Sequence, residues 1–160
     1  MTGEDAGPDP TRVVADADVL AADLLVGGPA REALDVVRRH SWLDLVATDP
    51  LLAHAEAVVA ELADPALADD WRELLAAQTM LVDQPAGDHP ALAAAYRGDA
   101  AHLLSFDERL RSARAGAELR EVVDVSVRSP DAFATVFEPA AVYETAVGSD
   151  YPGPDRDPRA

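Results

Sequence analysis

Acidic side chains follow several apolar runs of this sequence, at the points where those runs end. Asp16 comes directly after Arg12–Ala15, and Asp88 and Asp107 likewise follow later runs. Crowded carboxylates repel one another unless divalent cations neutralise them. Oxygen ligands without Cys or a well-spaced His pair favour Mg²⁺ or Mn²⁺. If the fold gathers these acids, they could hold an ion that activates water and stabilises the transition state of phosphodiester cleavage.

The elements that must position these acids are short strands and amphipathic helices in alternation. The runs with the composition of buried strands are Arg12–Ala15, Leu43–Ala47, Thr79–Val82, His102–Ser105 and Glu121–Ser126. The segments with helical spacing are Ala17–Leu25, Ala30–His40, Thr48–Ala63, Ala66–Gln78, Asp88–Arg97, Asp107–Ala115, Ala132–Phe137 and, beyond Pro139, Ala140–Ala146. This alternation predicts a three-layer α/β/α fold with a central parallel sheet of about five strands. The carboxyl ends of its strands share one edge, where open α/β sheets place ligands.

The domain organisation follows from where this alternation begins and ends. Residues 11–147 form the predicted domain, long enough for a hydrophobic core. Residues 1–10 and 148–160 are rich in Pro, Gly and Asp without apolar periodicity, and both are predicted to be disordered tails. Asp88 is predicted to cap the helix that contains Pro90.

The charge balance is strongly acidic, with 30 Asp and Glu against 13 basic residues, all of them Arg. A chain without Lys and rich in Ala and Asp is typical of the proteins of salt-loving archaea, where a carboxylate surface keeps a protein hydrated. Acidity usually argues against nucleic-acid binding, but this argument loses force in molar salt. There is no cysteine, and no apolar run could span a bilayer, so we expect a cytoplasmic protein with no membrane partner.

Three segments resemble the PIN-domain family. VVADADVLAADLL (13–25) resembles the family's opening strand, which ends in an aspartate before a helix. DHPALAAAYRGDAAHLLSFDERL (88–110) is similar to its second block, in which an acid, an Ala-rich helix and a strand precede Ser/Thr-x-Asp; here that element is Ser105-Phe106-Asp107. EVVDVSVRSPDAFATVF (121–137) is similar to the closing strand and helix. The resemblance spans about Arg12–Phe137, and the order and spacing of the motifs carry it.

The resemblance implies a PIN-like sheet in the order 3-2-1-4-5 and a metal-dependent nuclease, most often a ribonuclease, that uses Mg²⁺ or Mn²⁺. Carried over by position, the catalytic acids are Asp16, Glu56, Asp88 and Asp107. Glu56 is our choice for the acid after the second strand, with Asp49 and Glu61 as alternatives. Asp16, Asp88 and Asp107 are the expected metal ligands, and Asp99 could itself approach the metal.

Two departures from the family pattern surround the first acid. Ala17 and Asp18 stand where family members usually have hydroxyl or amide side chains, so a ligand-orienting hydroxyl is lost and a carboxylate is gained. The only basic concentration begins with Arg109 and Arg111, which could hold phosphates beside the acids.

The alternative function is a PIN-like module with little or no catalytic activity that binds RNA or a protein partner. Family resemblance also raises a homodimer and an antitoxin-like partner, as in toxin–antitoxin pairs. Asp16-Ala17-Asp18 also resembles the nucleophile motif of haloacid dehalogenase-type phosphatases, but that chemistry needs a Lys, or an equivalent cation, and a later Asp motif. The chain has no Lys, and Leu103 stands where that motif needs its acid.

Overall fold

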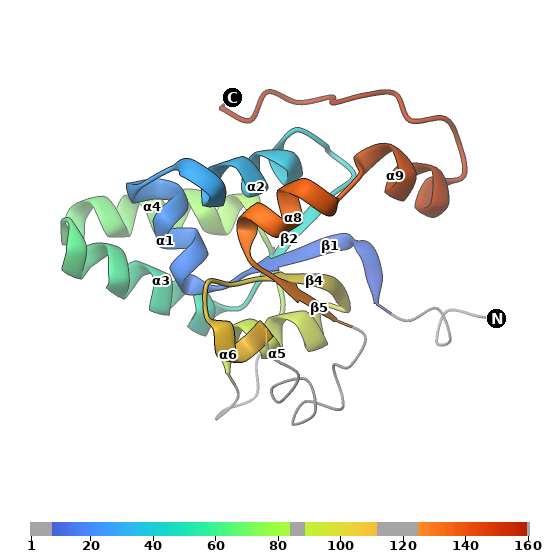
Figure 1. Ribbon diagram of the computed structural model, residues 1–160. Helices are drawn as coiled ribbons and strands as arrows, with labels where there is room; N and C mark the ends of the chain where they lie inside the picture. Colours follow the sequence, from blue (N-terminus) through green and yellow to red (C-terminus); the bar gives the residue numbers. More distant parts are fainter. Residues whose placement is uncertain (1–7, 84–88, 112–124, 160) are drawn as a thin grey trace.

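The computed structural model describes residues 8–83, 89–111 and 125–159 (Figure 1). Its centre is a parallel five-stranded sheet in the order β3-β2-β1-β4-β5. The strands are β1 (Asp9–Ala15), β2 (Asp44–Ala47), β3 (Met80–Leu81), β4 (Ala100–Leu104) and β5 (Ser126–Arg128). The predicted α/β class and strand order are thereby confirmed.

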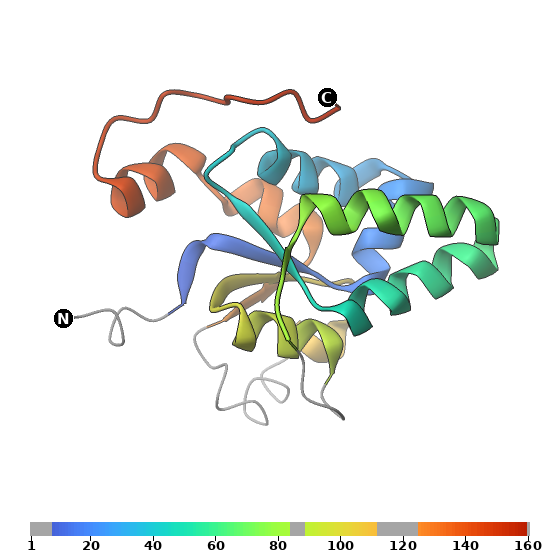
Figure 2. The ribbon, with the colours of Figure 1, turned by 180° about the vertical axis from the view of Figure 1, so that it is seen from behind.

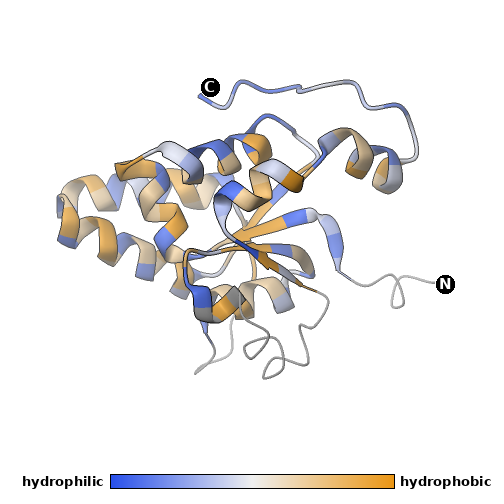
Figure 3. Ribbon diagram, in the orientation of Figure 1, coloured by the Kyte–Doolittle hydropathy of each residue, from blue (hydrophilic) through white to orange (hydrophobic). Residues whose placement is uncertain are grey.

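The middle of the sheet is made by β1 and its two neighbours. Val13 and Val14 are fully buried, because both faces of β1 are covered. In Figure 3 the second half of β1 is apolar and its first half hydrophilic, as the sequence pattern requires. β1 begins at Asp9, inside the predicted N-terminal tail, because the register with β4 pairs Asp9 with Ala100.

Helices cover both faces of the sheet (Figure 1). On one face lie α2 (Gly28–Arg38) and α8 (Pro130–Val136), and on the other lie α5 (Pro90–Arg97) and the short α6 (Glu108–Arg111). The helices α3 (Asp49–Leu62) and α4 (Pro65–Gln78) form an antiparallel hairpin that projects to one side, as Figure 2 shows from behind. The remaining helices are α1 (Ala17–Leu25), which packs on α2 and α3, and α9 (Pro139–Val147). Among the described residues, no helix combines the length and apolarity that a bilayer crossing needs.

Side-chain caps fix where most of these helices begin. Asp16, Thr48, Asp64 and Ser129 each accept a hydrogen bond from a backbone amide in the first turn of the helix that follows. For α5 the capping residue is His89, whose side chain accepts from the Ala91 amide, rather than the predicted Asp88. Asp88 itself lies outside the described residues.

The end of the chain follows a defined course over the molecule. Residues 149–159, which we call the C-terminal strap, contain no helix or strand and run from α9 past α2 (Figures 1 and 2). The Tyr151 hydroxyl lies 2.6 Å from His40 Nε2, and the Asp155 carboxylate accepts hydrogen bonds from the Ser41 amide and hydroxyl. This differs from the predicted disordered tail, because the partners that hold the strap lie more than 100 residues away in sequence.

Candidate functional site

The candidate site lies at the carboxyl edge of the sheet, between β1 and β4. From β1 the chain builds β2 and β3 on one side and later returns to place β4 and β5 on the other. This reversal is a topological switch point, where the loops diverge and leave room for a ligand. Asp16 follows β1 directly and Ser105 follows β4, and the Asp16 amide donates to the Leu104 carbonyl at 2.8 Å.

Asp16 is held rigidly by neutral donors. It is 8% exposed, and its Oδ1 accepts a hydrogen bond from the Ala17 amide at 2.8 Å, which caps α1. Its Oδ2 accepts a hydrogen bond from Ser105 Oγ, also at 2.8 Å. Burying an ionised carboxylate is costly unless polar partners or cations compensate for the lost water. Both of these hydrogen-bond partners are uncharged, so they stabilise the negative charge of Asp16 without neutralising it.

Ser105 connects the first and last predicted acids. Its side chain is fully buried, and its Oγ donates to Asp16 and accepts from the Asp107 amide at 3.0 Å. The structure therefore brings Asp16 and Asp107 to the same edge of the sheet, as the strand pattern predicted. This bridging role of Ser105 was not predicted from the sequence. The position of Ser105 in the Ser105-Phe106-Asp107 motif was the feature that could have indicated it.

Asp18 adds a third carboxylate to this edge. Its Oδ2 accepts a hydrogen bond from the Phe106 amide at 3.2 Å, and its buried Oδ1 has no hydrogen-bond partner among the described residues. Burial raises the pKa of the Asp18 carboxyl and the charge of Asp16 raises it further, with a smaller contribution from Asp107 and opposition from the Phe106 amide. We call Asp16, Asp18, Ser105 and Asp107 the switch-point cluster.

The switch-point cluster fits a hard divalent cation by its chemistry. Its side chains offer only oxygen atoms, and the buried Asp18 Oδ1 atom has no hydrogen-bond donor in the described part of the chain. Within the described ranges, no three His, Cys, Asp or Glu side chains are already arranged as a metal-binding group. Asp88, the predicted third acid, lies outside those ranges, so its role as a ligand stays a prediction.

Glu56 does not lie free at this edge. Its Oε1 accepts a hydrogen bond from Arg72 Nη1 at 2.8 Å, an ion pair that links α3 to α4. Its charge is therefore already balanced within the projecting hairpin. Of the two alternatives, Asp49 occupies the first turn of α3, immediately after the carboxyl end of β2, whereas Glu61 is near the far end of the helix. By position in the fold, Asp49 is the acid of α3 closest to this edge.

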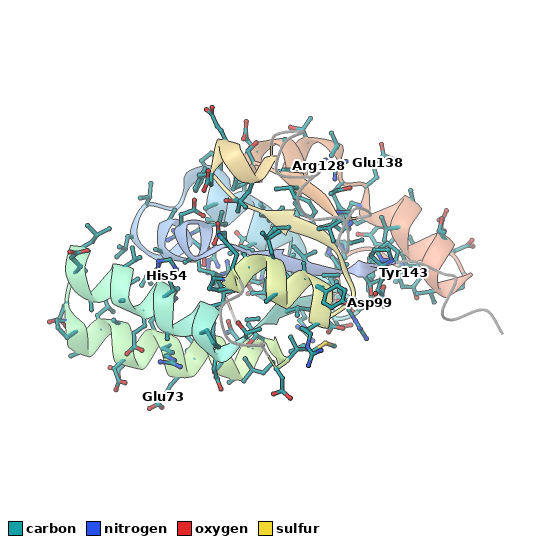
Figure 4. The ribbon with its side chains drawn as sticks, turned by 90° about the horizontal axis from the view of Figure 1, so that it is seen from below. His54, Glu73, Asp99, Arg128, Glu138 and Tyr143 are labelled. Atoms are coloured by element: carbon teal, nitrogen blue, oxygen red, sulfur yellow. The ribbon has the colours of Figure 1, made fainter. Side chains whose placement is uncertain are left out.

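Asp99 lies at the wrong end of β4 for the role predicted for it. It immediately precedes β4, and its carbonyl accepts from the Asp9 amide at 2.7 Å, so it belongs to the amino edge of the sheet. In Figure 4, Asp99 lies on the same side of the molecule as Tyr143 of α9, and His54 of α3 lies on the opposite side. The expectation that Asp99 approaches the metal is therefore corrected, because five residues of extended strand separate it from Ser105.

The predicted phosphate-binding arginines belong to α6. This helix begins directly after Asp107, which places its backbone at the same edge as the switch-point cluster. The side chains of Arg109 and Arg111 lie outside the described part of the structure, so their role stays a prediction.

A family model described as a family of unknown function, DUF7384, matches residues 7–159. No curated protein and no solved structure matches this chain. The matched range includes the C-terminal strap as well as every strand of the sheet.

Proposed function

Since this chain belongs to the DUF7384 family, whose function is unknown, we propose from its own geometry that it is a PIN-like, metal-dependent nuclease with RNA as its substrate. The observation that carries the proposal is that three acids lie at the switch point: Ser105 bonds the Asp16 carboxylate and the Asp107 amide, and the Phe106 amide between them bonds the Asp18 carboxylate. Three acids gathered where a fold of this class binds ligands are best explained by a cation that joins them. We place the protein in the cytoplasm of a salt-loving archaeon, in keeping with its composition.

The proposed ion is Mg²⁺ or Mn²⁺, with Asp16 and Asp107 as ligands and Asp88 as the predicted third. When bound, such an ion lowers the pKa of water and offsets the charge that develops on a phosphodiester in its transition state. The unpartnered Oδ1 atom makes Asp18 a further candidate ligand in this chain.

The protein's own contribution is to orient the acids. The Ala17 amide and the Ser105 hydroxyl fix both oxygens of Asp16, so this carboxylate cannot rotate without losing a hydrogen bond. Ser105 is not proposed as a nucleophile, because its hydroxyl donates to a carboxylate that it serves to hold. Water is therefore the attacking group in the proposed hydrolysis. Arg109 and Arg111 are proposed to contact the phosphates of the substrate.

The second candidate is a module that binds RNA or a protein partner without cleavage. Ala17 offers no hydroxyl beside the first acid, and the ion pair with Arg72 occupies the acid chosen from α3. In this alternative an antitoxin-like protein or a second copy of the chain would cover the switch-point cluster.

A cleavage assay separates the two candidates. Labelled single-stranded RNA is incubated with the protein in high-potassium buffer containing Mn²⁺, Mg²⁺ or EDTA. We expect metal-dependent cleavage that falls at least about 100-fold in Asp16→Asn and in Asp107→Asn, since each substitution removes a charged ligand. Glu56→Gln is the matched control, and we expect it to retain activity because Glu56 pairs with Arg72.

Thermal unfolding gives an independent measurement of the ion. Mn²⁺ should raise the melting temperature of the wild type and leave that of Asp16→Asn unchanged, because an ion that binds only the folded state stabilises it. A wild type that neither cleaves RNA nor responds to Mn²⁺ would contradict the nuclease and leave the binding module as the better candidate.

A further inference from the structure

A second cavity, remote from the switch-point cluster, lies where the C-terminal strap crosses the helices. It has a volume of about 380 Å³, which is within the range of small-molecule sites. Its walls come from the end of α1, from α2, from α4 and from the strap. The lining side chains that matter for recognition are Leu24, Arg31, Arg38, Trp71, Leu75 and Arg159.

Of the three arginines that line the cavity, Arg38 makes the most contacts with carboxylates of the protein. Arg38 Nη1 donates to Asp23 Oδ1 and to Asp35 Oδ1, each at 3.0 Å, and Nη2 pairs with the second oxygen of Asp23. These contacts join α1 to α2 beneath the cavity. Three of the five N–H groups of Arg38 are therefore engaged with carboxylates, which makes it the most strongly paired arginine of the cavity.

The other two arginines keep donors to spare. Arg31 donates through Nε and Nη2 to the Asp23 carbonyl, and Arg159 donates through Nη2 to Asp35 Oδ2 at 2.8 Å. A guanidinium carries five N–H groups, and within the described structure Arg31 Nη1 and Arg159 Nε have no hydrogen-bond acceptor. Their side chains are 43% and 52% exposed, so these groups are accessible to a ligand.

The charge around this cavity is opposite in sign to that of the whole chain. The residues that line the cavity carry three guanidinium groups and one carboxylate, that of Asp23, while Asp35 pairs with Arg38 and Arg159 from outside the lining. The chain as a whole carries a net charge of −17. A locally positive cavity on such a protein concentrates anions that the rest of the surface repels.

We propose that this cavity binds a small organic anion, with one phosphate or carboxylate group attached to a flat apolar body. The anionic group contacts Arg31 and Arg159, since guanidinium groups match the planar oxygens of carboxylates and phosphates. The flat body packs against Trp71 and Leu75, which supply an aromatic and an aliphatic wall. The strap contributes Arg159 itself, so a bound ligand also fastens the strap to the body of the protein.

Isothermal titration calorimetry with defined probes tests the site on the full-length protein. The probes are adenosine 5′-monophosphate and 2-naphthoate, which supply the two kinds of anion, with adenosine and inorganic phosphate as the separated halves. We expect one equivalent of at least one complete probe to bind, at least about 10-fold more tightly than either half. Affinity should fall at 1 M KCl relative to 0.15 M, because the two arginines are partly exposed.

Matched variants assign the binding to this cavity. Arg159→Gln and Arg31→Gln should each weaken binding at least about 10-fold, whereas Arg97→Gln, on α5, should not. Asp16→Asn should bind as the wild type does, which separates this site from the proposed nuclease centre. Quenching of Trp71 fluorescence in a Trp42→Phe background gives a second readout of the same contact.

Three results would overturn the proposal. The first is the absence of binding of both complete probes at millimolar concentration. The second is binding that Arg31→Gln and Arg159→Gln leave unchanged. The third is equal affinity for inorganic phosphate and for adenosine 5′-monophosphate, which would show that the apolar wall contributes nothing.

Discussion

The two ends of α1 treat a buried aspartate in opposite ways. Asp16 at its start and Asp23 near its end are 8% and 7% exposed, so both have lost most of their contact with water. Asp23 is paired with Arg38, and Asp35 beside it is paired with Arg38 and Arg159. Within the described ranges, the Asp16 carboxylate accepts hydrogen bonds from one amide and one hydroxyl, and two further acids lie at the same edge of the sheet.

This difference separates an acid that is paired with a cation of the fold from an acid that has only neutral hydrogen-bond donors in the described structure. The negative charge of a buried carboxylate is balanced when a guanidinium group pairs with it, and removal of the carboxylate leaves the buried cation without a counter-charge. The negative charge of a buried carboxylate among other carboxylates is not balanced, and such arrangements occur mainly at functional sites. Burial alone therefore does not identify a functional acid; the sign of the surrounding charge does.

The strongest test of this comparison makes the same substitution at both ends of α1. Asp23→Asn should lower the free energy of unfolding by about 3 kcal/mol, because it leaves Arg38 partly buried with one carboxylate fewer. Asp16→Asn should change it by less than about 0.5 kcal/mol, since Asn also caps helices and removes a repelling charge. Urea denaturation of both variants measures this difference. Equal destabilisation would show that the two ends of the helix are not distinct.

His102 sharpens the comparison with a buried ionisable group that has an arginine for a neighbour. It packs edge-on against Phe133 and Phe137, and burial, together with the charge of Arg128, lowers its pKa from 6.5 to about 4. Between pH 6.5 and 4 the His102 imidazole is therefore protonated in the unfolded chain but mostly neutral in the folded protein. Stability should decrease by about 3 kcal/mol in total as the pH falls from above 6.5 to below 4, and this contribution should become constant only well below pH 4.

The measurement for His102 is a difference between two proteins, because many carboxylates also titrate in acid. Urea denaturation of the wild type and of His102→Leu is compared at several pH values. The stability of the wild type relative to the variant should fall over that interval. A difference between them that does not vary with pH would contradict the shifted pKa.

The loss of stability expected for Ser105→Ala at the switch point is smaller than that of Asp23→Asn and than the acid effect at His102. The substitution removes one hydrogen bond to Asp16 and one from the Asp107 amide, with an expected loss of about 1 kcal/mol. Metal-dependent RNA cleavage should fall at least about 10-fold, because Asp16 becomes free to rotate. Ser41→Ala is the control, since Ser41 also binds a carboxylate, that of Asp155, but does so at the strap. Parallel losses of activity in both variants would mean that the effect is not local to the cluster.

The sequence predicted what depends on local pattern. The helix Ala17–Leu25 was predicted with the bounds that the structure shows, because Asp16 caps it and its apolar residues keep helical spacing. The placement of Asp16 and Asp107 at one edge followed from strand direction alone. Asp99 was misjudged although it precedes the strand both in the prediction and in the structure, because strand direction alone already assigns a residue before β4 to the amino edge.

The sequence could not predict contacts that join distant segments. Arg72 is 16 residues from Glu56, and the spacing of residues within α3 or within α4 does not indicate that these two side chains pair across the hairpin. The strap is a stronger case, because its Pro-rich and Gly-rich composition is typical of disorder. Tyr151 and Asp155 nevertheless find partners at the end of α2 that only the folded structure brings within reach.

The hydrogen bond between Ser105 and Asp16 joins residues 89 positions apart, and β1 reaches β4 only across the same separation. On the ribosome, the amino-terminal half of the chain can therefore emerge with β1, β2 and α1 in place while the neighbour of β1 is still being synthesised. The first acid is then an isolated carboxylate without its serine. The acidic cluster can therefore be completed only after β4 has been synthesised, whereas the pair of Asp23 with Arg38 needs residues of the first quarter of the chain alone.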